Sequence, residues 1–404
     1  MTPQKMTLEE RAFIQEHIQM DVSTLALQMR KYPHLNAALV LNQVAGWQDI
    51  VRKVPAWMHY PELLFPSKLS LEQCSSERTA AYKVALIDAL EGVESVADLT
   101  GGLGVDFSFL AKGRSKSFYV ERQSELCALV AHNLSVLGLE AAHVVHADGG
   151  AWLAGVSSVF DLIFVDPARR DSKGSKVSAL SDCEPDLTTL RPLLMRQSRY
   201  TLIKLSPMLD ISLAFNQMPE TIEVHVVSVE GECKELLFLL SSEVQAQEPT
   251  IHAVNLRNSL PNQVLTFLKS EEQAEPPLFA AVPLNYLYEP NASVLKAGPF
   301  GLLTRRYNVH KLHPNSHLYT STEFVADFPG RCFEVERYFP IHSKSLKKEL
   351  TGLSKANMTV RNFPESVDSL RKKTGLKEGG SVYLFATTLL NESKVFILCK
   401  MINR

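Results

Sequence analysis

Four acidic residues stand at the ends of short apolar runs in the first half of the chain: Asp98, Glu121, Asp148 and Asp166. These runs alternate with longer amphipathic segments, a pattern that predicts a parallel sheet with helices on both faces. Ligands of open α/β sheets bind at the carboxyl ends of the strands. Each acid alone could be a solvated loop residue, but four in register predict contacts with one bound ligand.

The first of these acids is followed by Leu99-Thr100-Gly101-Gly102-Leu103-Gly104-Val105-Asp106. A strand-to-helix turn that brings its backbone close to a ligand often needs a positive φ, which glycine permits without steric cost. We expect Gly102 and Gly104 to let the chain pass against the ligand, and Asp98 to keep the pocket polar near a cationic group. The alternative is a glycine-rich turn without a ligand, since a lone glycine fingerprint is weak.

The next acids suggest what the ligand is. Glu121 directly follows the second run, where a carboxylate accepts hydrogen bonds from both hydroxyls of a ribose. Asp148, in Ala147-Asp148-Gly149, follows the third run at a position that commonly contacts an adenine amino group. These positions predict a nucleoside-binding site.

The elements that must position these residues are short strands and helices. The predicted strands are Ser95–Leu99, Ser117–Val120, His143–His146, Leu162–Val165 and Tyr200–Lys204, and the clearest helix is Gln123–Leu137. Two further strand candidates, Thr221–Val229 and Glu235–Leu240, are joined by a link too short for a parallel crossover, so they predict an antiparallel hairpin. A classical nicotinamide-binding fold would continue with another crossover helix instead.

Residues 70–241 resemble class I S-adenosylmethionine-dependent methyltransferases. The whole chain resembles bacterial methyltransferase-like proteins with a C-terminal THUMP-like domain. The closer match lies in Glu72–Glu77 with Thr79 and Lys83, in Asp98–Gly102, in Asp166–Arg170, in Lys204–Pro207 and in Glu289–Ala292. The resemblance implies an α/β Rossmann-like sheet with a terminal antiparallel hairpin. It also implies four domains: helical 1–68, methyltransferase 69–243, ferredoxin-like α+β 244–330 and THUMP-like α+β 331–404.

The resemblance also implies S-adenosyl-L-methionine as the cofactor. The predicted cofactor-binding residues are Gln73, Ser76, Thr79, Lys83, Asp98, Thr100, Gly101, Gly102, Gly104, Asp106, Glu121, Arg122, Asp148, Gly149 and Asp166. Thr79 and Lys83 lie four apart on one face of a predicted helix, which suits a cap over an anion. A helix N-terminal cap by Ser75 or Ser76 is the alternative, and the two interpretations are compatible.

Methyl transfer is an in-line displacement, so the protein mainly positions the nucleophile and handles its proton. The candidate catalytic residues are Asp166, Pro167, Lys204 and Ser206. Lys204 and Ser206 could orient the acceptor or bind a phosphate, or Lys204 could only cap its strand. Lys204-Leu205-Ser206-Pro207 holds no cysteine, so a covalent thiolate mechanism of the kind used by pyrimidine-carbon methylating enzymes is not expected.

The residues after Asp166 depart from the pattern of amino-methylating relatives. Ala168 and Arg169 stand where those relatives have a second proline and an aromatic residue that stacks on a flipped base. This difference argues against an exocyclic-amine acceptor. Arg169 and Arg170 are candidate phosphate contacts, with a salt bridge to a neighbouring loop as the alternative.

A second candidate surface is basic. Residues 344–377 hold nine lysines and arginines against three acidic residues, a local charge of +6 in a chain of net charge −2. Such a segment is typical of a phosphate-contacting surface, although a solvated helix face is the usual explanation of a lysine run. The predicted RNA-binding residues, together with Arg169 and Arg170, are Lys347, Lys348, Arg361, Arg371, Lys372 and Lys373.

Composition excludes several other classes of protein. The six cysteines lie far apart without a Cys-x-x-Cys pair, which argues against a structural zinc site and a disulfide scaffold. No apolar stretch is long enough to span a membrane, and the N-terminal residues do not form a signal peptide. We therefore expect a cytoplasmic protein with no metal and no membrane partner; the oligomeric state is left open.

The prediction is an S-adenosylmethionine-dependent methyltransferase that acts on RNA and holds it with the basic C-terminal module. One alternative is a methyltransferase with a small-molecule or protein acceptor. The other is a non-catalytic RNA-binding protein on a methyltransferase fold, which Ala168 and the missing aromatic residue keep open.

Overall fold

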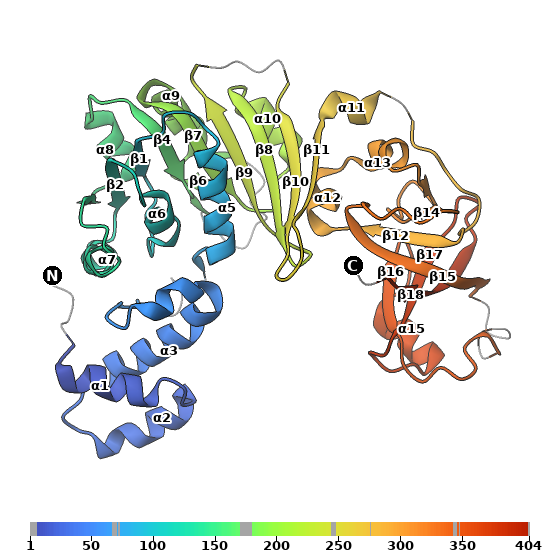
Figure 1. The fold of residues 1–404 in the computed structure, drawn as a ribbon, viewed down its shortest axis with the longest axis horizontal. Coiled ribbons are helices and arrows are strands. Elements are labelled where there is room, and N and C mark those ends of the chain that lie inside the picture. Colours follow the sequence, from blue (N-terminus) through green and yellow to red (C-terminus); the bar gives the residue numbers. More distant parts are fainter. Residues whose placement is uncertain are drawn as a thin grey trace. The chain divides into compact units, whose positions relative to one another are not determined.

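A computed structural model describes residues 6–66, 71, 73–169, 180–243, 248–274, 276–341, 346 and 348–402 (Figure 1). The chain forms two compact units. The first is Met1–Ile222 with Leu236–Ala246, and the second is Glu223–Glu235 with Gln247–Arg404. Among the residues described, no helix combines the length and apolarity that a membrane span requires.

The first unit begins with helices. They are α1 (Leu8–His17), α2 (Val22–Gln28) and α3 (Ala37–Lys53), with 3₁₀ turns η1 (Met29–Lys31) and η2 (Pro55–His59). The sequence Thr7-Leu8-Glu9-Glu10 predicts a capping box at the start of α1. It is confirmed, because the Thr7 hydroxyl accepts from the Glu10 amide and the Glu10 carboxylate accepts from the Thr7 amide. The apolar faces of these helices form one core around Val40, Val44 and Trp47.

The centre of the first unit is a parallel sheet, and the five predicted parallel strands are confirmed. In the sheet their order is β3-β2-β1-β4-β7, and each pairs in parallel with its neighbour. Their bounds are β1 (Ser95–Asp98), β2 (Lys116–Glu121), β3 (Ala142–His146), β4 (Phe160–Val165) and β7 (Ser198–Leu205). A short two-stranded sheet, β5 (Ala168–Arg169) with β6 (Cys183–Glu184), follows β4.

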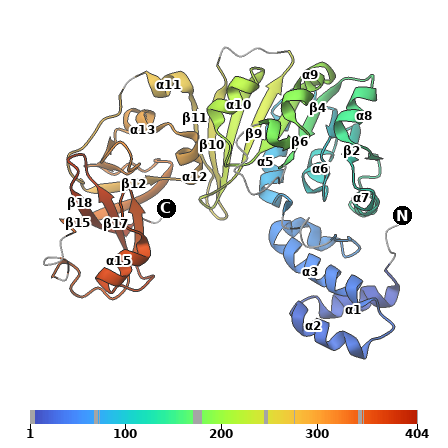
Figure 2. The same ribbon diagram turned by 180° about the vertical axis from the view of Figure 1, so that it is seen from behind.

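Helices cover both faces of this sheet, as the alternating pattern predicts (Figures 1 and 2; Figure 2 shows the ribbon from behind). Phe107 and Val130, from two helices, pack on Tyr119 of β2, whereas Trp152 packs on Phe118, which points to the opposite face. The helices are α5 (Glu77–Asp88), α6 (Val105–Leu110), α7 (Ser124–Val136), α8 (Gly149–Gly155), α9 (Leu187–Gln197) and α10 (Ile211–Gln217), with the 3₁₀ turn η3 (Leu180–Asp182).

The parallel series ends in the chain reversal that the sequence predicts. Only Glu230 and Gly231, both with positive φ, separate β8 (Thr221–Val229) from β9 (Glu232–Ser241). Two consecutive positive φ values are typical of the tight turns that join antiparallel strands. β9 then pairs antiparallel with β7, which completes the class I methyltransferase arrangement in the first unit.

The second unit continues with two strands that are not predicted from the sequence. β10 (Thr250–Leu256) pairs in parallel with β8 and antiparallel with β11 (Gln263–Leu268). A seven-stranded sheet follows, in the order β13-β14-β12-β15-β18-β17-β16. Its strands are β12 (Tyr286–Pro290), β13 (His310–Lys311), β14 (Tyr319–Ser321), β15 (Gly330–Pro340), β16 (Asn357–Arg361), β17 (Val382–Thr388) and β18 (Lys394–Met401).

Four helices of the second unit lie within the described residues: α11 (Lys269–Gln273), α12 (Ala292–Ala297), α13 (Phe300–Arg306) and α15 (Val367–Thr374). α15 is the crossover between β16 and β17, the parallel pair in the seven-stranded sheet. Beyond residue 245 the sequence predicts strands at Ala280–Val282, Phe333–Tyr338, Met358–Val360, Val382–Ala386 and Val395–Cys399. The last four are confirmed as parts of β15, β16, β17 and β18. Ala280–Val282 is wrong, because only an isolated bridge at Phe279 forms there. Prolines 276, 277 and 283 flank that run, and proline donates no ladder hydrogen bond.

Candidate functional site

The loop after β1 closes tightly on the end of β2. Gly102 and Gly104 have φ of 53° and 76°, the left-handed region that glycine enters most easily. A Cβ on Gly101 would lie 2.2 Å from the ring of Tyr119, whose hydroxyl donates to the Gly102 carbonyl. The three glycines therefore have local steric reasons for being glycine, whether or not a ligand is bound.

Glu121 fixes the same loop from the end of β2. Its Oε2 accepts from the Gly102 amide at 3.0 Å, and its Oε1 accepts from the Gln123 amide at 2.9 Å. The side chain is buried, so these bonds hold it in one position. Each carboxylate oxygen can accept more than one hydrogen bond, which leaves acceptor capacity for hydroxyl donors.

Thr100 links the ends of β1 and β4. Its amide donates to Asp98 Oδ1 at 2.9 Å, and its hydroxyl accepts from the Asp166 amide at 2.7 Å. Asp98 is buried, and this desolvation, together with the charges of Asp106 and Asp166, raises its pKa to about 8. The end of β1 is therefore a place where a bound cation would restore the ionised carboxylate.

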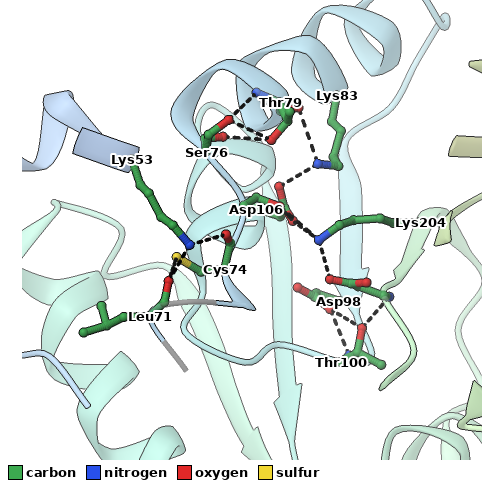
Figure 3. Close-up of polar contacts among 12 residues, drawn as sticks. Lys53, Leu71, Cys74, Ser76, Thr79, Lys83, Asp98, Thr100, Asp106 and Lys204 are labelled. Carbon is green, nitrogen blue, oxygen red and sulfur yellow. Dashed lines mark hydrogen bonds and ion pairs between the residues drawn. The ribbon is translucent and has the colours of Figure 1, made fainter. Parts of the chain in front are cut away.

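Asp106, in the first turn of α6, is the centre of a charged cluster (Figure 3). Its Oδ1 accepts from Lys83 Nζ at 3.0 Å, and its Oδ2 accepts from the Ser75 hydroxyl at 2.6 Å. Lys204 Nζ, at the end of β7, lies 3.7 Å from Asp106 Oδ2 and 2.5 Å from Asp166 Oδ2. We call Lys83, Asp106, Asp166 and Lys204 the charge cluster.

The cluster sets the ionisation of its central acid. Burial alone would raise the pKa of Asp106, but the attraction of Lys83 and Lys204 and the hydrogen bond from Ser75 outweigh it, so the pKa is lowered. Lys83 is fully buried against Asp106. Its main contact in the structure is therefore this carboxylate, and its predicted role as a cap over a ligand anion stays a prediction.

The segment before α5 is bound from two sides. Ser76 caps α5, since its hydroxyl accepts from the Thr79 amide, and this cap was one of the two compatible interpretations of the sequence. Lys53 Nζ, from the end of α3, donates to the carbonyls of Leu71 and Cys74 at 2.7 and 3.4 Å. Leu71, Cys74 and Ser75 thus join the N-terminal helices to the charge cluster.

The N-terminal helices also share their core with the glycine loop. Leu103 and Val105 belong to the same buried apolar cluster as Trp47 and Trp57. In addition, the Asn133 side chain exchanges two 2.9 Å hydrogen bonds with the backbone of residue 64. The helical segment therefore supports the loop and the helices beside it.

Other predicted cofactor residues lie near strand ends without joining the cluster. Asp148 is exposed and caps α8 through the Ala151 amide, and a Cβ on the following Gly149 would lie 2.3 Å from the Leu99 carbonyl. Arg122 is exposed and paired with Glu184. The close approach of Gly149 to the Leu99 carbonyl brings the end of β3 against the end of β1, as the register of the four acids predicts.

Some of the remaining predicted site residues lie within the described residues and others do not. Gln73 is exposed, while Pro167 and Ser206 are half-buried. Ser206 accepts from the Met208 amide at 3.3 Å. Arg170, Lys347 and the side chain of Arg169 lie outside the described residues.

The basic residues of the C-terminal module do not form one free surface. Arg361 Nη2 lies 2.6 Å from Oε1 of Glu289, a buried residue of β12 that also accepts from Arg331. Arg371 pairs with Glu378, and Lys373 donates to Glu365 at 2.7 Å. Lys348 and Lys372 are exposed.

Four residues make contacts at these sites that are not predicted from the sequence: Tyr119, Ser75, Lys53 and Glu289. Tyr119 carried a usable signal, because it lies two residues before Glu121 on β2 and so faces the same side of the sheet. Lys53 and Glu289 carried none, since their partners lie far away in the sequence. Ser75 was predicted as a helix cap or as part of a segment that closes over the cofactor, and not as a partner of Asp106.

Comparisons with known proteins agree with this architecture. Family models match residues 286–329 as a ferredoxin-like domain and residues 330–401 as a THUMP domain-like region. A crystal structure of a "putative methyltransferase" from Porphyromonas gingivalis W83 is 33% identical, covers 100% of both chains and superposes with a TM-score of 0.87. A comparison with curated proteins finds no match.

Weaker matches cover only part of the chain. An rRNA methylase from Streptococcus thermophilus is 14% identical over 41% of this chain and 95% of its own, with a TM-score of 0.31. A SAM-dependent methyltransferase from Agrobacterium tumefaciens is 15% identical over 41% and 61%, with a TM-score of 0.29. No conclusion about this chain follows from these two.

The fold of the first unit is that of class I methyltransferases, with the terminal antiparallel strand in place. The chain belongs to the family of the Porphyromonas gingivalis protein, in which a class I methyltransferase fold is combined with a C-terminal THUMP-like domain.

Proposed function

We propose that this protein is an S-adenosylmethionine-dependent methyltransferase that acts on RNA. The observation that carries the proposal is the convergence of Asp98, Glu121 and Asp166 on the glycine loop at the carboxyl edge of the parallel sheet. Membership of a family with a class I methyltransferase fold supports the reaction class.

The residues present fit this cofactor. Gly102 and Gly104 supply the left-handed loop, and the buried carboxylate of Asp98 suits the cationic amino group of an amino acid. Glu121 keeps acceptor capacity for a ribose, and Asp148 lies at the adjoining strand end. When bound, S-adenosylmethionine supplies a methyl group from a sulfonium centre. The four-domain division and the individual residue roles are part of the proposal.

Asp166 is the residue we expect to meet the acceptor. It follows β4, is half-buried, and its carboxylate is held by Lys204 at 2.5 Å while its amide is held by Thr100. A carboxylate fixed in this way can orient a nucleophile and accept its proton. Lys204 is then a positioning residue, and the sequence offers no cysteine beside it.

RNA is the proposed acceptor because of the C-terminal module. Residues 330–401 match a THUMP domain-like family, and the exposed Lys348 and Lys372 lie within that region. Exposed lysines suit the phosphate contacts that give RNA-binding proteins their salt-dependent affinity. The proposed location of this enzyme is the cytoplasm, where its cofactor and RNA are both present.

Calorimetric titration with S-adenosylhomocysteine and S-adenosylmethionine tests the cofactor site. We expect one equivalent to bind, and Glu121→Gln to weaken binding by about 10- to 100-fold, as for a lost hydrogen bond to a charged group. Glu140→Gln, at an exposed position, is the matched control and should leave the affinity unchanged. Absence of binding to the wild-type protein would refute the proposal.

A second experiment separates RNA from other acceptors. RNA from cells that lack the protein is incubated with purified protein and methyl-labelled cofactor, and the labelled nucleoside is identified. Asp166→Asn should abolish incorporation but retain cofactor binding, whereas Asp327→Asn, an exposed control, should be fully active. Cofactor binding without incorporation into RNA would favour a non-catalytic protein or a different acceptor.

A further inference from the structure

Two histidines and a glutamate meet on one face of neighbouring strands in the second unit. Glu223 and His225 are two residues apart on β8 and therefore point to the same face, and His252 of β10 lies directly opposite His225 in the parallel register. The two imidazole rings stack, with centroids 4.5 Å apart and planes 7° apart. None of these residues belongs to the candidate cofactor site.

The donor atoms of the three side chains are close together. Glu223 Oε2 lies 2.9 Å from His225 Nε2 and 3.8 Å from His252 Nε2, and all three ligand atoms lie within 4.8 Å of one another. Two ligands of a tetrahedral zinc ion, each about 2.0–2.1 Å from the metal, are separated by roughly 3.4 Å. The observed separations lie on both sides of this value.

The hydrogen bonding of His252 Nδ1 leaves Nε2 available as a metal ligand. His252 Nδ1 lies 3.0 Å from the hydroxyl of Thr266 on β11. This hydroxyl can accept a hydrogen bond from the Nδ1–H group, which leaves the lone pair of the neutral ring on Nε2. Among the described residues, Nε2 has no hydrogen-bond partner although the atom is buried. A buried nitrogen without a partner is costly, and a bound cation would remove that cost.

We propose that Glu223, His225 and His252 bind one divalent transition-metal ion of the zinc type. Imidazole and carboxylate ligands suit such an ion, and three protein ligands leave a coordination position for water. Binding requires the stacked rings to turn so that their lone pairs converge, a rotation about soft terminal torsions. The Glu223 side chain is 36% exposed, so the ion can enter from solvent.

The test uses the full-length protein after removal of metals with a chelator, titrated with ZnCl₂ alone. The wild-type protein should bind one equivalent more than His252→Gln, and Zn²⁺ should raise the Tm of the wild-type protein but not of this variant. Thr266→Val keeps all three ligands and should weaken binding by about tenfold, as expected for loss of an outer hydrogen bond to a ligand.

The matched control is His34→Gln. His34 forms an exposed pair with Glu9 at 3.0 Å and lies outside the three-residue group. It should bind Zn²⁺ like the wild-type protein. Equal stoichiometry for wild-type and His252→Gln would overturn the proposal, as would an equal loss in His34→Gln. If His252→Gln fails to fold by circular dichroism, the Thr266→Val affinity decides, and an unchanged value counts against the site.

Discussion

The charge cluster and the basic C-terminal segment contain similar residue types in opposite arrangements. In the cluster, Lys83, Asp106 and Lys204 are buried or nearly so and come from three elements that converge at one edge of a sheet. In the basic segment, the charges are neighbours in sequence and are mostly exposed. Burial makes each pair of the first region energetically important, whereas solvent screens those of the second.

The two regions also differ in how well the sequence describes them. The strand-end acids were predicted together because parallel strands bring their carboxyl ends to one edge. The local charge of +6 overstates the free charge of residues 344–377, because Glu289 and Glu378 lie outside that range and pair with Arg361 and Arg371. The alternation of strands and helices therefore predicts which strand-end residues lie together. A local count of charges does not predict how many of those charges are free on a surface.

The largest expected effect comes from breaking the charge cluster. Asp106→Ala leaves Lys83 buried without its carboxylate, and we expect the free energy of unfolding of the first unit to fall by about 3–5 kcal/mol. Tryptophan fluorescence during urea unfolding reports this unit, because all three tryptophans lie in it. Glu62→Ala, which removes an exposed pair with Arg11 in the same unit, should cost less than about 1 kcal/mol. If the two variants lose similar amounts of unfolding free energy, the buried pairs of the charge cluster are no more important for stability than an exposed pair.

The next effect is a pH dependence from Asp98. Its folded-state pKa of about 8 lies above the ordinary 3.8, so its contribution to stability is full below pH 3.8 and is lost as pH rises to about 8. A cationic ligand group binds the ionised carboxylate, so affinity for S-adenosylmethionine should increase with pH by up to about tenfold per unit below 8. Calorimetry in buffers of different ionisation enthalpy should detect proton release near pH 7, and Asp98→Asn should abolish that release. An affinity independent of pH would contradict this assignment.

A smaller effect is expected from Glu289 in the second unit. Glu289→Gln weakens the pairs with Arg331 and Arg361, and should lower the unfolding free energy of this unit by about 2 kcal/mol. Hydrogen exchange of the amides in β12 and β15 measures the change. Glu334→Gln, at an exposed position on β15, is the control and should leave exchange unaltered. Unaltered exchange in both would show that Glu289 does not organise the module.

The smallest effects sharpen the description of the basic surface. If the exposed Lys372 contacts a phosphate, Lys372→Gln should reduce the slope of log affinity for single-stranded RNA against log salt by about 0.7. Arg361→Gln should leave that slope unchanged, because the Arg361 guanidinium is already held by the buried Glu289 carboxylate. Filter binding across a salt series gives both slopes. The reverse order of effects would mean that the ion pair opens when RNA binds.

Much of the chain up to residue 241 followed from the sequence alone. The five parallel strands, the helix over residues 124–136, the chain reversal after β8 and the capping box at Thr7 were all predicted. Each depends on local patterns: apolar periodicity, glycine conformation, or a hydrogen bond between residues three apart. The second unit was predicted less well, since β10 and β11 were missed and Ala280–Val282 is not a strand.

What the sequence by itself determined is the set of residues at the strand ends, because alternation of strands and helices fixes which positions share an edge. Only the tertiary structure decided which charges are partners: Lys83 with Asp106, Lys204 with Asp166, and Arg361 with Glu289. The physical reason is that an ion pair depends on the separation of two side chains in space. That separation is set by the packing of elements far apart in the chain, which no local pattern records.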